Sequence, residues 1–395
     1  MTVRTNVSGA DNFVLQEAIS AYSDEAYTNA RKLSGTGIVG GNPLIDTTTE
    51  TFVGQVRWYK PLNPTINVAS LTDDTDGTGT TYSSDYLNYV KTVRTHGATK
   101  VNMQQVVTQV DGLAKIGRDF GETRAQDEHN AILAVLRGVA ISEALNGCAA
   151  GSGNTGLGGQ TFDNDPANKR YGFYVDLGSA KPIIDATSAV QGASRAEGFL
   201  RAFGMAYKDY EPEFAYLICS PEIVASLRSA NLVDSTTVVD GNVTFNTIFQ
   251  GKFRLIQTRA SQGFSSAELT KLNTGAGVDI TGTKTSFIVL PGALAMEPLM
   301  VPDEVEIERK AAAYKGGGTT SVWYRWGYVL HPAGYNWNGS QDAFPADADY
   351  LKVKEGSDLK ALTDVTSGTL ASTAGTWTRK VSSALSLGIL PVFHS

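Results

Sequence analysis

The glycine-rich segment that begins at Gly151 has the letters of a dinucleotide-binding motif. Gly151-Ser-Gly153-Asn-Thr-Gly156 matches G-x-G-x-x-G at every position. In that motif a strand precedes the glycines and a helix follows them, so that the helix N-terminus faces the pyrophosphate. Here a helix is expected before the segment, and the residues after it, up to Pro166, cannot begin one. The sequence therefore predicts a surface loop rather than a nucleotide site.

The histidines form no pattern typical of metal binding or acid–base catalysis. None lies in H-E-x-x-H or beside C-x-x-C, the spacings that place ligands around zinc. We expect His129 on the surface of a helix, and His331, which precedes Pro332, in a structural role at the end of a strand. The sequence thus signals no metal ion and no cofactor. The full set is His96, His129, His331 and His394.

The two cysteines, Cys148 and Cys219, are far apart and belong to no C-x-x-C pair. We expect free thiols in a reducing compartment, because such spacing gives no reason for a bridge. Cys219 adjoins Ser220, but a nucleophile needs a nearby base and none is indicated. A small residue in a buried strand is the favoured interpretation.

Three acids alternate along a short segment near residue 305. Glu304, Glu306 and Glu308 are spaced by two residues, with Val305 and Ile307 between them. Paired carboxylates could act as general acid and base, but that chemistry also needs a cleft and partner groups. Alternation with a period of two is typical of a strand with one solvated face. We therefore favour a solvated strand face, and we expect no catalytic residues.

Composition favours a large protein that assembles with other chains. Of the 395 residues, 42% are hydrophobic, which suits a substantial buried core. Charged residues make up 18%, below the ~25% typical of soluble domains. Because stable interfaces are depleted in charge, this favours an assembled protein. The net charge of −7, and the absence of Lys/Arg clusters between the aromatic residues, argue against nucleic-acid recognition.

Neither a signal peptide nor a membrane span is indicated. The first nine residues lack the apolar core of a signal peptide. The most apolar stretch, 132–141, is short and is interrupted by Arg137. We expect a protein that is made and used without secretion.

Helix and strand periodicities intermix without a regular β-α-β rhythm, which predicts an α+β fold. A helix is predicted over 10–34, and a strand over 51–59 is followed by a return strand over 82–96. The polar segment 72–81 would be the flexible tip of this long two-stranded excursion, a β-hairpin that extends from the rest of the fold. Because an isolated hairpin is only marginally stable, we expect this one to pack against a partner surface. A helix over 119–147, with acids at its start, would span roughly 40 Å. Further elements are expected at 188–207, 214–218, from Pro221 onward, and at 252–258, 286–290, 304–310 and 322–330.

The C-terminal third of the chain carries a family resemblance. It contains, in this order, a hydrophobic strand and turn, an alternating strand, a glycine break, an aromatic strand, a polar helix, a Trp-x-Arg motif and a final hydrophobic strand. This order resembles the major capsid protein of tailed bacteriophages, whose fold is named after the Hong Kong ninety-seven phage. The resemblance is dense over 285–395 and loose before residue 285. The segments are 285–298, 305–310, 316–318, 322–337, 359–364, 376–379 and 387–393.

The resemblance implies a division of the whole chain. Residues 1–50 would be an N-terminal arm and 51–100 an extended E-loop. Residues 101–210 would be a peripheral (P) domain with a long spine helix, and 211–300 would form most of an axial (A) domain. Residues 301–395 would return to the P domain and supply the last strand.

The resemblance also implies a function. Subunits of the family form hexamers and pentamers, which close into an icosahedral shell around packaged double-stranded DNA without sequence-specific binding. Partners would be further copies of the chain, a separate scaffold protein, a portal and, where the head carries one, a cement or decoration protein. The chain would assemble in the host bacterial cytoplasm and reside in the virion, with no cofactor and no membrane. We expect neighbour contacts from Trp58, Tyr59, Lys60, Tyr82, Tyr86 and Arg94.

Two variations of the family are not expected here. Because the segment before residue 51 is short, we predict no cleaved prodomain. Lys60 and Lys91 lie on the expected loop, but isopeptide cross-linking of subunits is not favoured.

Two other kinds of protein stay open at this point. An encapsulin, a cellular nanocompartment shell that encloses a cargo enzyme, shares the fold but generally has a shorter E-loop. A soluble oligomeric enzyme of α+β fold would need a clustered acid–base constellation, which no motif indicates.

Overall fold

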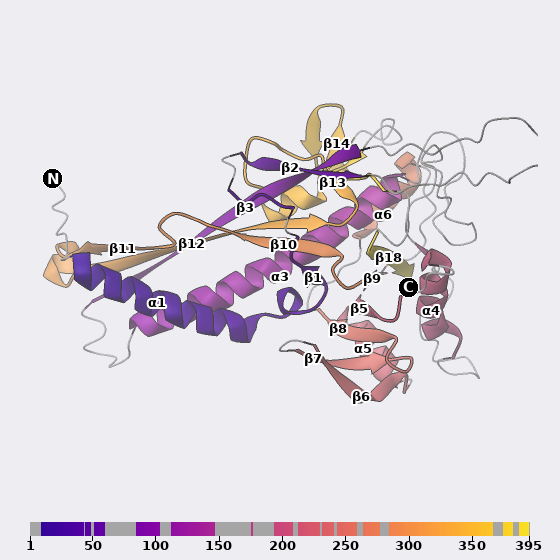
Figure 1. Ribbon diagram of the computed structural model, residues 1–395, viewed down its shortest axis with the longest axis horizontal. Coiled ribbons are helices and arrows are strands. Elements are labelled where there is room, and N and C mark those ends of the chain that lie inside the picture. The colour runs from indigo at the N-terminus through magenta and orange to yellow at the C-terminus, as the bar shows by residue number, and fades with distance from the viewer. Residues whose placement is uncertain are drawn as a thin grey trace, which may run out of the picture.

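The computed structural model is elongated, with a narrow arm along its long axis and a broader body at the other end (Figure 1). A sheet that continues from the arm into the body connects the two parts. The structure describes residues 9–42, 44–48, 51–59, 84–102, 112–146, 175–176, 193–207, 212–229, 231–240, 243–258, 264–276, 284–365, 374–381 and 387–394.

The connecting sheet has six strands, and its central pair comes from distant parts of the chain. β3 (Ser84–Val101) and β12 (Thr319–Pro332) are antiparallel and paired from Val101↔Thr319 to Lys91↔Val329. β2 (Val53–Tyr59) lies beside the first half of β3. β12 therefore pairs with β3 beyond the predicted two-stranded excursion, so this hairpin is anchored by a strand of its own chain. On the other side of β12 lie β10 (Leu294–Leu299), which also pairs with β1 (Val39–Gly40), and β11 (Val305–Lys310).

Two parallel helices cover one face of this sheet in the arm. α3 (Gly112–Asn146) has 35 residues, which corresponds to about 52 Å at 1.5 Å per residue. α1 (Gly9–Ala30) lies beside its first half. The helices approach closely at Gly117 and Gly121, one turn apart on α3. A Cβ atom on Gly121 would overlap the Ser23 carbonyl oxygen and lie 2.7 Å from the Tyr27 backbone nitrogen, so only glycine fits.

The body contains a seven-stranded sheet in the order β4-β18-β9-β5-β8-β7-β6. β5 (Ala215–Cys219) and β8 (Phe253–Gln257) are parallel, and β9 (Lys284–Val289) flanks β5 antiparallel. The last strand, β18 (Ile389–His394), pairs with β9. This mixture of strands and helices confirms the α+β prediction. The remaining elements of the body are β4 (Val175–Asp176), β6 (Val233–Asp240), β7 (Val243–Ile248), α4 (Ala193–Tyr207), α5 (Pro221–Ser229) and α6 (Ser266–Ala276).

The Trp-x-Arg of the tail holds the C-terminal region against α3. Trp377 begins β17 (Trp377–Arg379), is fully buried, and has its ring centroid 4.9 Å from that of Trp337. Arg379 forms a 3.0 Å ion pair with the buried Glu143 of α3. The motif is thus a structural anchor. The short elements around it are β13 (Tyr335–Trp337), β14 (Val353–Glu355), β15 (Asp358–Lys360), β16 (Ala374–Gly375), η4 (Asp347–Leu351) and η5 (Leu362–Asp364).

Several elements differ from the sequence-based expectation. α3 begins seven residues earlier than predicted and has no acid in its first turn. The predicted polar helix at 359–364 is instead the end of β15 followed by the 3-10 turn η5. β10 has no predicted counterpart, because Pro298 lies inside it and proline disfavours a strand assignment. Within the described ranges, no helix has the length and apolarity needed to cross a membrane.

Candidate assembly surface

The described residues bring no metal-binding cluster together. Among them, no three His, Cys, Asp or Glu side chains are grouped so that they could hold a metal ion. Glu306 and Glu308 are exposed on β11 while Val305 is buried, which confirms the predicted solvated strand face. Cys219 is fully buried in β5, where burial raises the pKa of its thiol to about 12. It is therefore an inert structural cysteine, as predicted.

Two histidines are interior residues of the body. His331 is 6% exposed beside Trp377, and burial lowers the pKa of its imidazole to about 4. It occupies the structural position predicted for it. His394 is buried, with its Nε2 atom 2.8 Å from Ser286 Oγ, a contact that joins β18 to β9. The G-x-G-x-x-G segment and Cys148 lie outside the described residues.

A groove of about 740 Å³ is lined by the C-terminal part of α1 and by α3. Its lining includes the apolar side chains of Ala26 and Leu133 and charged side chains of both signs. His129 of α3 lines the groove and is half-buried. Burial, and the nearby charge of Lys32, lower the pKa of its imidazole. Mixed charges of this kind do not single out one ligand.

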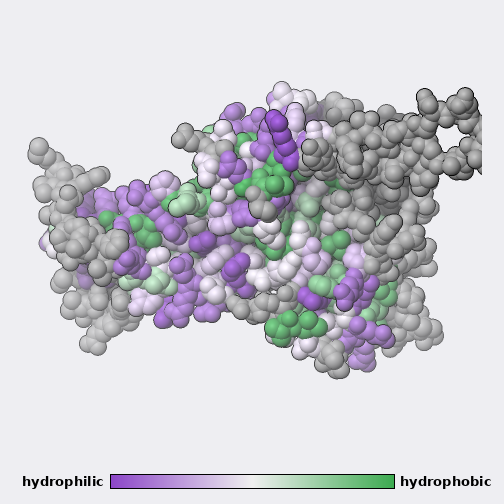
Figure 2. All heavy atoms as spheres, in the orientation of Figure 1, coloured by the Kyte–Doolittle hydropathy of each residue, from purple (hydrophilic) through white to green (hydrophobic). Residues whose placement is uncertain are grey.

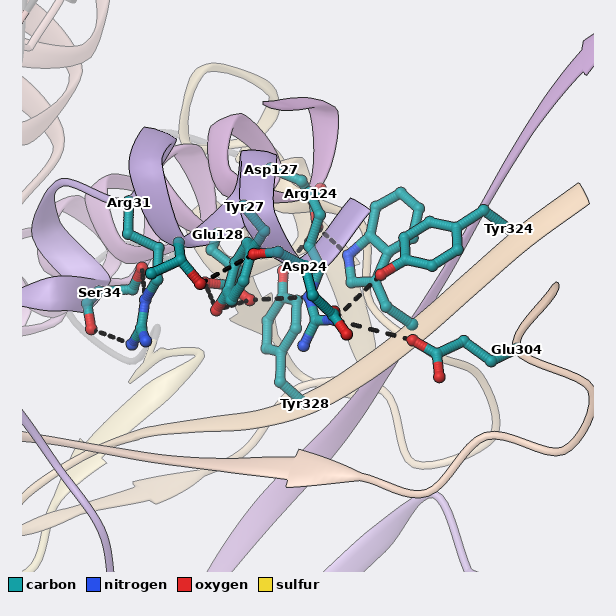
Figure 3. A network of polar contacts seen from close by, with 12 residues as sticks. Asp24, Tyr27, Arg31, Ser34, Arg124, Asp127, Glu128, Glu304, Tyr324 and Tyr328 are labelled. Carbon is teal, nitrogen blue, oxygen red and sulfur yellow. Dashed lines mark hydrogen bonds and ion pairs between the residues drawn. The ribbon is translucent and has the colours of Figure 1, made fainter. Parts of the chain in front are cut away.

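A polar network holds α1 to α3 and to the sheet of the arm (Figure 3). The Tyr27 hydroxyl of α1 donates to the Glu128 carboxylate of α3, at 2.8 and 2.7 Å from its two oxygens, and Glu128 is 1% exposed. Arg124 lies 3.4 Å from Glu128 and donates to the Tyr324 hydroxyl of β12 at 3.0 Å. Desolvation and the Glu128 charge raise the pKa of Tyr27, so its hydroxyl stays protonated as the donor. The network makes α1 an integral part of the arm.

Arg94, one of the expected neighbour contacts, directs its guanidinium to groups of its own chain. Nε lies 3.3 Å from Asp127 and Nη2 lies 2.9 Å from Asp347. Nη1 donates to the Pro345 carbonyl oxygen at 2.6 Å. Asp127 also accepts a hydrogen bond from Trp326 Nε1 at 3.1 Å. These bonds join β3 to α3 and to the segment that leads into η4.

The other expected contact residues belong to the far end of the β2–β3 pair. Tyr86 is 52% exposed on β3. The backbones of Trp58 and Tyr59 end β2 opposite residues 85 and 84. Lys60 and Tyr82 lie outside the described residues. Tyr86, Trp58 and Tyr59 are therefore brought to the same end of the strand pair.

Several large apolar side chains are exposed, and of these only Tyr86 is among the contact residues expected from the sequence. Met300 is 98% exposed in the connection between β10 and β11, and Phe52 and Phe344 stack edge to face with centroids 4.8 Å apart. Figure 2 shows apolar side chains gathered near β2 and at the free end of the β6–β7 hairpin, within a largely hydrophilic surface. Periodicity locates strands but does not say which face stays uncovered. The set is Leu44, Phe52, Tyr86, Val239, Met300, Tyr314, Trp323 and Phe344.

Comparison with solved structures finds phage capsid proteins. The chain is similar to the capsid of Ralstonia phage GP4, with 11% identity, coverage of 78% of this chain and 86% of that chain, and a TM-score of 0.45. It is similar to the head structure of Helicobacter pylori bacteriophage KHP40, with 8% identity, coverage of 91% and 89%, and a TM-score of 0.43. It is also similar to the capsid asymmetric unit of cyanophage Pam1, with 11% identity, coverage of 79% of this chain and 88% of that chain, and a TM-score of 0.40. No family model and no curated protein matches the sequence.

Proposed function

We propose that this chain is the major capsid protein of a tailed phage, the subunit of an icosahedral head shell. The observation that carries the proposal is the order of its elements. The N-terminal helix α1 is followed by the β2–β3 hairpin, the long helix α3 and the mixed sheet of the body. The late strand β12 then returns to pair with β3. This is the order that the resemblance of residues 285–395 implies.

The connections of α3 support a role as the spine of a rigid shell subunit. Near its middle, Glu128 accepts hydrogen bonds from the arm helix through Tyr27. Near its end, Glu143 binds Arg379 of the tail. One helix of about 52 Å is thereby bonded to both parts of the molecule. A load applied at one end of the subunit would be carried to the other without a flexible joint.

We assign the elements to the domains that the resemblance implies. α1 belongs to the N-terminal arm (1–50), and β2 with the first half of β3 forms the base of the E-loop (51–100). α3 is the spine of the P domain (101–210). The seven-stranded sheet forms the A domain (211–300), which also takes β18 from the last segment (301–395). The second half of β3 is a strand of the P-domain sheet.

In this proposal the shell is built from hexamers and pentamers of the chain and encloses double-stranded DNA without reading its sequence. A separate scaffold protein, a portal and a cement protein, where the head carries one, would be the other partners. Trp58, Tyr59, Lys60, Tyr82 and Tyr86 would contact a neighbouring subunit. Arg94, the sixth expected contact residue, also binds Asp127, Asp347 and the Pro345 carbonyl oxygen of its own subunit.

The first test is electron microscopy of the full chain, paired with mass from light scattering, with and without its scaffold. Rings of five or six subunits, tubes or closed shells are expected. A stable monomer under both conditions would contradict the proposal. The content of the particles distinguishes a phage head from an encapsulin shell. Packaged DNA in native particles supports a phage head, and a co-purified enzyme would indicate an encapsulin.

A second test shortens the loop between the two strands while keeping the sheet. Replacing 62–81 with a short Gly/Ser linker leaves β2 and β3 intact. Closed shells should be lost while the unfolding temperature of the free subunit stays unchanged. Normal shells from this variant would contradict the proposed role of the loop.

A further inference from the structure

We infer that β18 is a strap that opens locally at its His394 end and is held closed there by a polar contact between His394 and Ser286. Opening of the strap exposes the buried thiol of Cys219, which gives the motion a chemical readout. The inference goes beyond the proposed function, because it concerns a motion within one subunit and not the assembly of subunits.

The strap is an almost entirely apolar strand. β18 pairs with β9 over six residues, from Ile389↔Val289 to His394↔Lys284, and lies beside β9 in the body (Figure 1). All six side chains of β18 are buried, and that of His394 is the only polar one among them. Because apolar contacts have no direction, the polar contact of His394 gives this end of the strand a defined partner.

That contact joins two fully buried side chains. The Nε2 atom of His394 lies 2.8 Å from the Oγ atom of Ser286 on β9. A serine hydroxyl at this distance from an imidazole has the geometry of a nucleophile and its base, but complete burial keeps a substrate from reaching it. Its role is to stabilise the closed strand. Removing either partner would bury the other without this hydrogen bond, which favours an open strand.

The backbone of β18 is held mainly on one side. Pro391 lies in the middle of the strand, opposite Phe287, and has no N–H to donate. On the side away from β9, β18 pairs with β4 at only two of its residues. Local opening favours segments with few backbone hydrogen bonds, so this strand can separate without global unfolding.

The other end of the strap is a close backbone contact that serves as its hinge. The Leu290 backbone nitrogen donates to the Gly388 carbonyl oxygen at 2.7 Å. A Cβ atom on Gly388 would lie 2.5 Å from the Ala293 Cβ, in the turn between β9 and β10, so only glycine fits. The entry to β18 therefore stays close to β9 while the His394 end moves away.

Ser286 links the strap to Cys219 on the next strand. β9 lies between β18 and β5, and Cys219 ends β5 directly after Ile218, which pairs with Phe287. The Ser286 hydroxyl also hydrogen-bonds Cys219. Departure of the imidazole uncovers this hydroxyl and the thiol next to it. Since a buried thiol is inert, its alkylation reports the open strap.

The experiment measures alkylation of Cys219 by N-ethylmaleimide in the free full-length chain at pH 8 without denaturant, with the modified peptide quantified by mass spectrometry. Ser286→Ala and His394→Phe should each raise the rate by about tenfold or more, because each removes one partner of the buried contact. The double variant Ser286→Ala/His394→Phe replaces both partners by apolar groups and should react more slowly than either single variant.

Tyr27→Phe is the matched control, because it removes a buried hydrogen bond of the arm. It should leave the alkylation rate unchanged. Single variants with the wild-type rate, or a double variant faster than both, would overturn the inference. An equal rise in Tyr27→Phe would also overturn it, since the thiol would then be exposed by global unfolding.

The wild-type chain decides the matter if a variant does not fold. Amide hydrogen exchange over 389–394 should depend less on urea than exchange over 320–331 of β12, because local opening exposes less surface than global unfolding. Equal dependence on urea would contradict a local strap. The free subunit is the sample throughout, so the result does not depend on whether the chain assembles.

Discussion

The close contact of α1 with α3 at Gly121 gives a quantitative prediction. An alanine Cβ at this position would overlap the Ser23 carbonyl oxygen and lie 2.7 Å from the Tyr27 nitrogen and 2.9 Å from the Ala26 Cβ. Because two of these atoms are backbone, no rotamer change relieves the overlap, and the helices must separate. The Gly121→Ala variant should therefore weaken the docking of the arm helix.

Opposing effects set the size of the change. Glycine to alanine in an open helical site stabilises by ~1 kcal/mol. Overpacking of a close contact costs about 1–3 kcal/mol. Separation of the helices also withdraws the Tyr27 hydroxyl from the buried Glu128, which costs about 1–3 kcal/mol. The expected net loss in the free energy of unfolding is thus about 1–5 kcal/mol.

Two glycines of the same chain provide graded controls. Gly204 in α4 has nothing within 4 Å of an added Cβ, so Gly204→Ala should stabilise. Gly117 is intermediate, because its Cβ would lie 2.9 Å from the Tyr22 Cβ and 3.1 Å from the Ile19 carbonyl oxygen. Urea unfolding of the free full-length chain gives the free energies, and hydrogen exchange over 16–30 reports the docking of α1. Equal effects of Gly121→Ala and Gly204→Ala would refute the reasoning.

Four further outcomes follow from single side chains. Tyr27→Phe removes the donor to Glu128 and should lower the free energy of unfolding by about 1–3 kcal/mol; no change in urea unfolding would contradict the network. Tyr314→Gly relieves a left-handed residue and should raise the free energy of unfolding by up to about 1 kcal/mol, and a lower free energy in urea unfolding would count against stored strain. Cys219, whose pKa is raised to about 12, should resist alkylation in the native protein at pH 8 and react once unfolded, as mass spectrometry would reveal. His331 has a folded pKa of about 4 against an unfolded value of 6.5, so the unfolded state binds the proton first; stability should fall as pH drops from 6.5 through 4, and His331→Asn should flatten that dependence.

Many elements could be predicted from local patterns. The alternation around Trp323 predicted β12, the proline after Ser220 predicted the start of α5, and helical spacing of apolar residues located most of α3. These signals exist because periodicity and terminal residues depend only on neighbours in the sequence. The structural roles of Cys219 and His331 were predicted correctly for the same reason, since each lies in or beside such a pattern.

The intramolecular partners of the candidate contact residue Arg94 could not be predicted. Arg94 has the charge and position of an interface residue, but Asp127 and Asp347, from two distant segments, bind it within the subunit. Nothing near Arg94 in the sequence indicates those partners. The glycine break at 316–318 was predicted, but the left-handed conformations of Tyr314 and Lys315 were not, because neither residue is the asparagine or glycine that usually adopts them.

Most strand and helix segments, the lack of a recognisable catalytic motif and the family resemblance of the tail could be predicted from the sequence alone. These properties reside in composition and short-range order. The tertiary fold alone pairs β3 with β12, brings α1 close to the glycines of α3, and leaves one face of the arm sheet uncovered by these two helices. Each of these depends on segments far apart in the chain, whose free energy of contact is set by close packing and by burial of polar groups rather than by local propensity.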